Sequence, residues 1–342
     1  MSKKIKIIFL LGATAIALFL GISIGGAAIS LGDICTVFAN KLFNVPLPDG
    51  FGSILSGLIW NIRLPRVCLS FIVGAALAVS GSVIQSVLKN PLASSYTIGV
   101  SSGAGLGAVI VIVSGISSGI LGRFLMPVVA VIFGMGTVYI SMLFASRVSR
   151  NIENNSIVLM GMVLSVFINA VMMTLAARNA HYAQQISSWQ LGSFALKDWS
   201  IVGIIFAATA VGIFLLARYT KEMDVLAFGD EQAGALGVKV RKIKWMLIIL
   251  SSVLTGVSVA FVGVVGFVDL IAPHVIRRFF GSSHKYVVPL SALFGGTFMV
   301  LSDLIARTAA LPSEIPVGSV TALIGAPFFA YIFLKNRKGK GE

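Results

Sequence analysis

Long apolar runs separated by short polar segments dominate the pattern of positions along the chain. Runs long enough to cross a bilayer lie at residues 6–28, 64–87, 95–114, 125–145, 156–177, 199–217, 245–267, 288–306 and 317–334. A transmembrane helix needs about 20 predominantly apolar residues. Alternating ten-residue segments, which would indicate a membrane β-barrel, do not occur. The pattern therefore predicts an all-α protein that crosses the membrane many times.

One shorter apolar run, residues 268–280, decides how many spans are counted. It lies between Gly266 and Gly281, contains Pro273 and ends in two arginines. Counted as a short span, it brings the expected number to about ten transmembrane helices. An even number places both termini on the same side of the membrane.

The distribution of basic residues supports this count and sets the orientation. If the N-terminus is cytoplasmic, 19 of the 26 lysines and arginines fall in inner segments. The seven at outer positions are Lys41, Arg63, Arg66, Arg123, Arg178, Lys197 and Arg307. Cytoplasmic loops of membrane proteins carry an excess of basic residues. Without the short run, the basic C-terminal tail would lie outside, so we expect about ten helices with both termini cytoplasmic.

Composition indicates a membrane protein, and we expect one polytopic domain over residues 1–342 in the cell membrane. Hydrophobic residues make up 57% and charged residues only 11%, whereas soluble domains carry about 25% charged residues. The net charge of +14 raises the possibility of nucleic-acid binding, but the basic residues form short clusters between apolar runs, which argues against it. The first apolar run exceeds the roughly 7–15 residues of a signal-peptide core, which favours an uncleaved first span.

Motifs for catalysis or cofactor binding are missing from the sequence. It contains no Walker A pattern, no H-E-x-x-H and no G-x-S-x-G. Cys35 and Cys68 have neither disulfide nor metal-site spacing and are interpreted as small apolar residues. We therefore expect no enzyme activity, no cofactor and no metal site in this chain.

Three stretches together resemble the FecCD family of importer permeases. The first runs Arg63-Leu-Pro-Arg66, then Val73-Gly-Ala-Ala-Leu-Ala-Val-Ser-Gly81, Gln85, Asn90-Pro-Leu-Ala93 and Ile98-Gly-Val-Ser-Ser-Gly-Ala104. The second is Gly229-Asp-Glu-Gln-Ala-Gly-Ala-Leu-Gly-Val238. The third comprises Gly263-Val-Val-Gly-Phe267, Pro273-His274, Asp303-Leu-Ile-Ala-Arg307, Glu314-Ile-Pro-Val-Gly318 and Thr321-Ala-Leu-Ile-Gly-Ala-Pro-Phe328. The resemblance covers about residues 55–335.

The resemblance implies the permease subunit of an ATP-driven (ABC) importer. Such a subunit has ten helices and pairs with a second permease subunit, either an identical copy or a close paralogue. Two ATP-binding cassette subunits dock on the cytoplasmic side, and a substrate-binding protein delivers substrate outside. Membrane lipid is expected to surround the helices of the subunit. A ferric siderophore is the expected substrate because most of the family handles iron chelates, while haem and cobalamin remain open.

The sequence departs from the family pattern at two places. Relatives often carry a proline where this chain has Ser95, and they usually read Gly-Leu where it has Asp269-Leu270. An acid near the membrane interior is often functional. The alternative is a surface-facing acid that favours a helix N-terminus through the helix dipole.

Arginines at outer span ends are the candidate dock for the binding protein: Arg63, Arg66 and Arg307. Arginine forms bidentate pairs with carboxylates, and in the vitamin B12 importer arginines at matching motif positions are thought to dock. Asp303 precedes Arg307 by one helical turn and is expected to orient it. The alternative is that these arginines only reach the lipid headgroups.

Two inner segments have candidate roles. The segment that resembles the family's ATPase-contacting loop includes Gly229, Asp230, Glu231, Ala233, Leu236 and Gly237. Its small residues permit close approach, and its alternative is a structureless loop. Asn154 and Asn155 precede the fifth span and are candidates for an inner gate, with an ordinary helix cap as the alternative.

Two other classes of protein compete with the importer permease. A stand-alone secondary transporter or channel usually needs charges inside the membrane, and only Asp269 and Asp303 are candidates. A membrane enzyme would need a catalytic cluster, which the sequence does not contain.

Overall fold

The computed structural model describes residues 2–26, 29–48, 51–116, 120–148 and 154–338. Over these ranges the regular structure is helical, and no strand occurs in them. The elements are α1 (Lys3–Ser23), α2 (Leu31–Phe43), α3 (Ser53–Gly57), the π-helix η1 (Leu58–Arg63), α4 (Leu64–Val87), α5 (Val100–Val113), α6 (Ile120–Val148), α7 (Asn154–Arg178), the 3₁₀ turn η2 (Ala180–Tyr182), α8 (Ala183–Leu191), α9 (Trp199–Ala217), α10 (Thr220–Leu226), α11 (Asp230–Ala235), α12 (Val240–Val262), α13 (Val268–Phe280), α14 (His284–Thr308) and α15 (Val317–Lys338).

Long helices occupy the predicted spans. Within the described part of the chain, seven helical segments are long and apolar enough to cross a membrane: α1, the continuous segment Ser53–Val87, α6, α7, α9, α12 and α14. Helices α5, α13 and α15 occupy the other three predicted spans. The all-α fold is confirmed, while the number of ten crossings stays a prediction.

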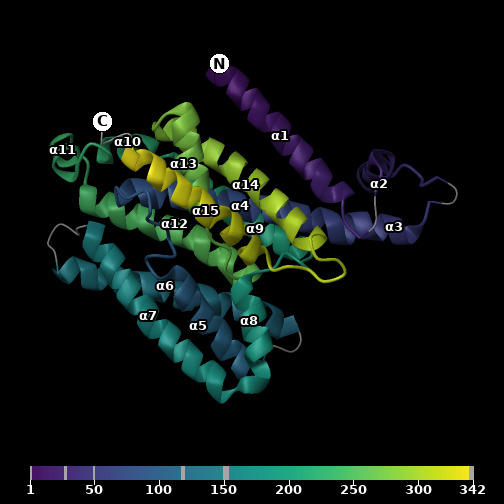
Figure 1. The fold of residues 1–342 in the computed structure, drawn as a ribbon, viewed down its shortest axis with the longest axis horizontal. Helices are drawn as coiled ribbons and strands as arrows, with labels where there is room; N and C mark the ends of the chain where they lie inside the picture. Colours follow the sequence, from purple (N-terminus) through teal and green to yellow (C-terminus); the bar gives the residue numbers. More distant parts are fainter. Residues whose placement is uncertain (1, 27–28, 49–50, 117–119, 149–153, 339–342) are drawn as a thin grey trace.

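Helix α4 lies at the centre of the bundle. It packs against α14, α12, α13 and α9 (Figure 1), and most of its side chains are buried. Small residues allow these neighbours to approach: a Cβ on Gly74 would lie 2.3 Å from the Gly295 carbonyl oxygen, and one on Gly81 would lie 1.9 Å from that of Asp269. In lipid, helices associate through this kind of close packing.

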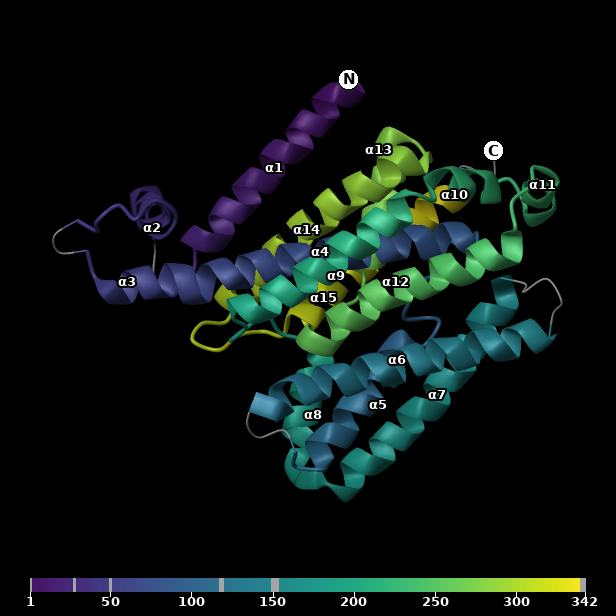
Figure 2. The same cartoon turned by 180° about the vertical axis from the view of Figure 1, so that it is seen from behind.

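Helices α5, α6, α7 and α8 form a group of their own on one side of the bundle (Figure 2). They pack on one another, and α6 joins them to α12. Between this group and α4, the chain forms a buried apolar core that includes Val79, Val83, Ile98 and Leu247.

The chain reverses direction between α12 and α13. Gly263 and Phe267 in the connection have positive φ angles of 81° and 70°, and the backbone N–H of Ser193 donates to the Val262 carbonyl at 2.8 Å. Helix α13 begins beside Gly81 of α4, inside the bundle, and its 13 residues span only about 20 Å. A helix of half length thus returns the chain to the end where α12 began.

The two ends of the molecule carry different elements. Helices α2 and α3 lie at one end, whereas α10, α11 and the end of α15 lie at the other (Figure 1). Helix α4 runs between these ends over about 36 Å. The three predicted docking arginines lie at its first end, and the predicted ATPase-contacting segment lies at its second.

Candidate functional site

An arginine–carboxylate cluster joins α4 to α14 at the first end. Arg66 Nε and Nη2 donate to the Asp303 carboxylate at 2.9–3.1 Å, and its Nη1 and Nη2 donate to Glu314 at 2.8 and 2.9 Å. Hydrogen bonds from Arg66 hold the pKa of Glu314 below its ordinary value, against the opposing effect of partial burial. One guanidinium therefore links two helices and the loop before α15.

The other two arginines reach the end of α1. Arg63 Nη1 donates to the Ile22 carbonyl at 2.9 Å, and Arg307 Nη2 donates to the Gly21 carbonyl. Arg307 lies farther from Asp303, with 3.9 Å between its Nε and the Asp303 carboxylate. The side chain that Asp303 holds most closely is thus Arg66, which is 237 residues away, and Arg307 is a weaker partner.

The three arginines lie close together at the first end, but their side chains are buried. Arg63, Arg66 and Arg307 are 5%, 9% and 6% exposed. Each has acceptors within this chain, so a carboxylate of a docking partner would have to compete with them. The exposed carboxylate of the cluster is Glu314, whose side chain is 43% exposed. A cavity of about 270 Å³ adjoins the cluster and separates Arg66, Asp303 and Glu314 from α8.

A second cavity, of about 560 Å³, lies between α5, α7 and α8. Its polar lining consists of hydroxyl, amide and indole groups, and methionines supply much of the rest. The lining residues are Tyr96, Ser101, Ser102, Gly105, Ser165, Asn169, Met172, Met173, Ala176, Ala183, Ile186, Ser187, Trp189, Gln190 and Val264. None of these residues carries a formal charge. The cavity can offer several weak polar contacts and no strong ion pair.

Asp230 is the centre of a polar cluster at the second end. It accepts hydrogen bonds from Lys89 at 2.8 Å and from Lys244. Lys244 also donates to Asn154 Oδ1 at 2.8 Å. Partial burial opposes ionisation of Asp230, but the hydrogen bonds from the two lysines lower the pKa of Asp230 below its ordinary value. The carboxylate is therefore ionised at neutral pH.

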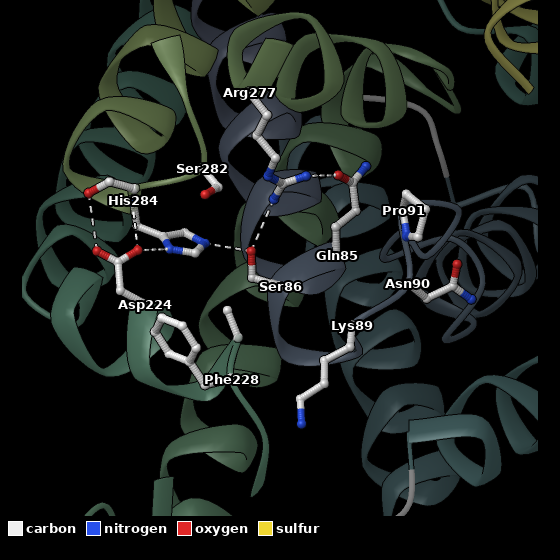
Figure 3. A pocket seen from close by; sticks show the side chains of 12 residues that line it. Gln85, Ser86, Lys89, Asn90, Pro91, Asp224, Phe228, Arg277, Ser282 and His284 are labelled. Atoms are coloured by element: carbon white, nitrogen blue, oxygen red, sulfur yellow. Dashed lines mark hydrogen bonds and ion pairs between the residues drawn. The ribbon is translucent and has the colours of Figure 1, made fainter. Parts of the chain in front are cut away.

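Figure 3 shows a neighbouring pocket of about 540 Å³ where α4, α10, α13 and α14 meet. His284 lies between Asp224 and Ser86, at 2.5 Å from each, and Arg277 donates to the Ser82 carbonyl and to Ser86. The Ser86 hydroxyl donates to the Ser82 carbonyl at 2.8 Å. The connected serine, histidine and aspartate therefore tie α4, α10 and α14 together.

The predicted ATPase-contacting segment is folded, so a structureless loop is excluded there. Asp230, Glu231 and Ala233 lie in α11, and Ala233 is fully buried against the core. Gly229 and Gly237 flank the helix with positive φ angles of 140° and 86°, which favour glycine. Leu236 is 71% exposed. A compact element therefore presents an apolar side chain outward.

The predicted gate residues lie at the start of α7. Asn154 is the first residue of the helix and binds Lys244, while Asn155 is exposed. Asp269 lies at the start of α13 and is 2% exposed. The idea of a surface-facing acid at that position is therefore wrong. The polar neighbours of its carboxylate are Ser94 and the backbone of Asp269 and Leu270.

Several residues of these clusters escaped the sequence interpretation: Lys244, Lys89, Asp224, His284, Arg277 and Glu314. From the sequence alone, Lys244 is one of many basic residues in the inner segments, and His284 is expected in a loop. Only the fold shows that each faces an opposite charge or a hydroxyl more than ten positions away. The Glu314-Ile-Pro-Val-Gly pattern was the one available signal for Glu314.

Comparison with known proteins supplies the family. The model of the FecCD transport family matches residues 13–335. The chain belongs to the FecCD transport family. It is 37% identical to the ABC transporter permease YvrB of Bacillus subtilis, over 95% of this chain and 92% of that protein. The cobalamin import permease BtuC of Halobacterium salinarum is 36% identical over 86% of this chain and 78% of its own length.

Two further similarities support the assignment. The hemin transport permease HmuU of Yersinia pestis is 36% identical over 82% of this chain and 84% of its own length. A solved ABC transporter assigned to the metal-chelate type, in an inward-facing conformation, aligns with a TM-score of 0.83 at 31% identity. That alignment covers 96% of this chain and 99% of the other. This FecCD protein is thus an ABC importer permease of the cell membrane that works with ATPase and permease partners.

Proposed function

We propose that this FecCD permease carries an iron chelate, most specifically a ferric siderophore, into the cell. The observation that supports the proposal is the uncharged cavity between α5, α7 and α8. A chelate presents many hydroxyl, amide and carbonyl groups around a shielded metal ion. Weak, distributed contacts suit its passage, because a wall that bound it tightly would retain it.

The path is proposed to follow α7 along the axis shared with the second permease subunit. Ser165 and Asn169 line the cavity in the middle of α7, and Asn154 and Asn155 lie at its inner start. Large apolar side chains on α7, among them Val166 and Phe167, are exposed in the single chain. We therefore assign the two asparagines to an inner gate and the adjoining face to contacts with the partner subunit.

Docking is proposed at the two ends of α4. With α10 and α11 cytoplasmic, Leu236 and its segment contact an ATP-binding cassette subunit, and the arginine cluster lies beneath the surface that receives the binding protein. Because Arg63, Arg66 and Arg307 are buried, we propose that they hold the outer helix ends in register. Their positive charge also attracts acidic groups of the binding protein at the surface above them.

Substrate choice is tested with the assembled complex and its binding protein in liposomes. Ferric hydroxamate, ferric catecholate, ferric citrate, haemin and cobalamin are compared at equal concentration for stimulated ATP hydrolysis and for uptake. We expect a ferric siderophore to stimulate both. Stimulation by haemin or cobalamin alone would replace the proposed substrate by that compound. Uptake without ATP or without an ATPase subunit would favour the stand-alone transporter.

A further inference from the structure

Lys244 connects three helices through one buried ammonium group. It lies in α12 and is 0% exposed. Its Nζ donates to Asn154 at the start of α7, at 2.8 Å, and to Asp230 at the start of α11. These partners lie 90 and 14 positions away. A single side chain thus joins the segment with exposed Leu236 to the helix that lines the uncharged cavity.

The burial of Lys244 makes this connection obligatory. An ammonium group has donors and no acceptor, and a charge removed from water is tolerated only when it is paired and hydrogen-bonded. The described residues give Lys244 two hydrogen-bond acceptors, namely Asp230 and Asn154. If α11 moved without α7, the ammonium would lose one of them inside the protein.

We propose that Lys244 is the positioning residue that transmits a displacement of α11 to the inner end of α7. The inference rests on the proposed function, in which α11 follows the ATPase and Asn154 and Asn155 form the inner gate. Coupling between distant sites needs packed elements that move together. The chain Asp230–Lys244–Asn154 supplies such a link over three consecutive polar groups.

Lys89 provides a matched control within the same cluster. It binds the other oxygen of Asp230 at 2.8 Å, yet its side chain is 30% exposed and lies in the turn after α4. Lys89→Met therefore removes a lysine from the same carboxylate and leaves the link to α7 intact. Lys244→Met keeps a side chain of similar length, removes the ammonium group and so breaks the link between α11 and α7.

The first experiment measures transport per ATP hydrolysed by the reconstituted complex with its binding protein. For Lys244→Met we expect this ratio to fall about tenfold, within the usual range of allosteric couplings, while basal hydrolysis continues. Lys89→Met should stay near the parent, and Lys244→Arg should recover part of the ratio. An unchanged ratio in Lys244→Met would overturn the proposal.

Asn154→Leu keeps the Lys244–Asp230 ion pair and removes the hydrogen bond from Lys244 to α7, together with one amide of the proposed gate, so it serves if Lys244→Met fails to assemble. We expect the same fall in transport per ATP. A normal ratio in Asn154→Leu would contradict a link through the asparagine.

The second experiment reads the connection directly, by spin labels at Gly234→Cys in α11 and Asn155→Cys in α7. Cys35 and Cys68, both free thiols, are first replaced by serine. Gly234 has open space around its Cα, so a label fits there. We expect the distance between labels to stay fixed on ATP binding in the parent and to change or broaden in Lys244→Met. A distance that stays fixed in both would overturn the proposal.

Leu236→Asp separates failure of this inference from failure of the proposed function. If Leu236→Asp abolishes stimulated hydrolysis and Lys244→Met has no effect, only the link through Lys244 is wrong. If Leu236→Asp also has no effect, the assignment of α11 to the ATPase contact is wrong, and the inference fails with it.

Discussion

Arg66 holds Asp303 through three hydrogen bonds of 2.9–3.1 Å, across 237 residues of sequence. The same guanidinium binds Glu314, whose side chain is 43% exposed, whereas that of Asp303 is 2% exposed. The cluster therefore contains one buried and one half-exposed ion pair around a single arginine. Because the two ion pairs differ in burial, we expect them to contribute differently to the free energy of unfolding.

Asp303→Asn should destabilise the permease more than Glu314→Gln. Removing one partner of a buried pair costs about 3–5 kcal/mol, while an exposed pair contributes only about 0–1 kcal/mol. Thermal unfolding in detergent, followed by loss of the assembled complex, measures both. Equal shifts in the two variants would show that solvent screens both pairs alike.

The ion pair between Arg66 and Glu314 also predicts how stability depends on pH. Since the pKa of Glu314 is lowered in the folded protein, its contribution is fully present above the ordinary glutamate pKa. That contribution is lost as the pH falls through the lowered value. We expect the difference in stability between the parent and Glu314→Gln to be constant from about pH 6 to 8 and to shrink only in acid.

Arg63→Glu combined with Arg307→Glu should greatly weaken capture of the binding protein. The change reverses two charges beneath the outer surface and releases the carbonyls of Ile22 and Gly21. Pull-down across a salt series measures capture, and capture by the parent should weaken as salt rises. Basal ATP hydrolysis is the control, since it depends on the opposite end. Unchanged capture would mean that the arginines only fix helix ends.

Leu236→Asp should abolish substrate-stimulated ATP hydrolysis while leaving membrane insertion intact. Leu236 is an exposed apolar side chain next to α11, and a charge there would have to be desolvated in an apolar contact. Leu236→Met keeps the apolar volume and should retain stimulation. Normal stimulation in Leu236→Asp would contradict an ATPase contact at this residue.

Gly81→Ala should disturb folding far more than Gly203→Ala. A Cβ at Gly81 would lie 1.9 Å from the Asp269 carbonyl oxygen, whereas Gly203 has open space. The α4–α13 contact would have to open, which overpacking data place at about 1–3 kcal/mol or more. The yield of monodisperse protein and its thermal unfolding report the effect. Similar behaviour of both variants would show that α13 can shift freely.

Asp269→Asn tests the buried acid at the start of α13. We expect little change in stability and nearly normal uptake, because the amide keeps the shape of the buried side chain and removes an acid whose charged form burial disfavours. The measurement compares substrate uptake by Asp269→Asn and by the parent at matched expression. Loss of uptake at normal expression would assign Asp269 a role in the path.

The sequence by itself determined the elements and their order. Apolar runs of about 20 residues predicted helices because a backbone in lipid must satisfy its hydrogen bonds internally. The half-length run at 268–280 was recognised because Gly266 and Gly281 bound it. The start of α2 at Leu31 also follows from local sequence, since Ser30 and Asp33 form a capping box there.

Only the tertiary structure decided which charges meet. Arg66 and Asp303 lie far apart in sequence, and so do Lys244 and Asn154, so no local periodicity predicts either pair. The sequence suggested Arg307 for Asp303 because one helical turn separates them, yet Arg66 approaches more closely from α4. The burial of the arginines likewise follows from the packing of α1 and α14 around α4. Long side chains meet where helices cross, and helix crossings depend on small residues such as Gly74 and Gly295, whose partners only the fold selects.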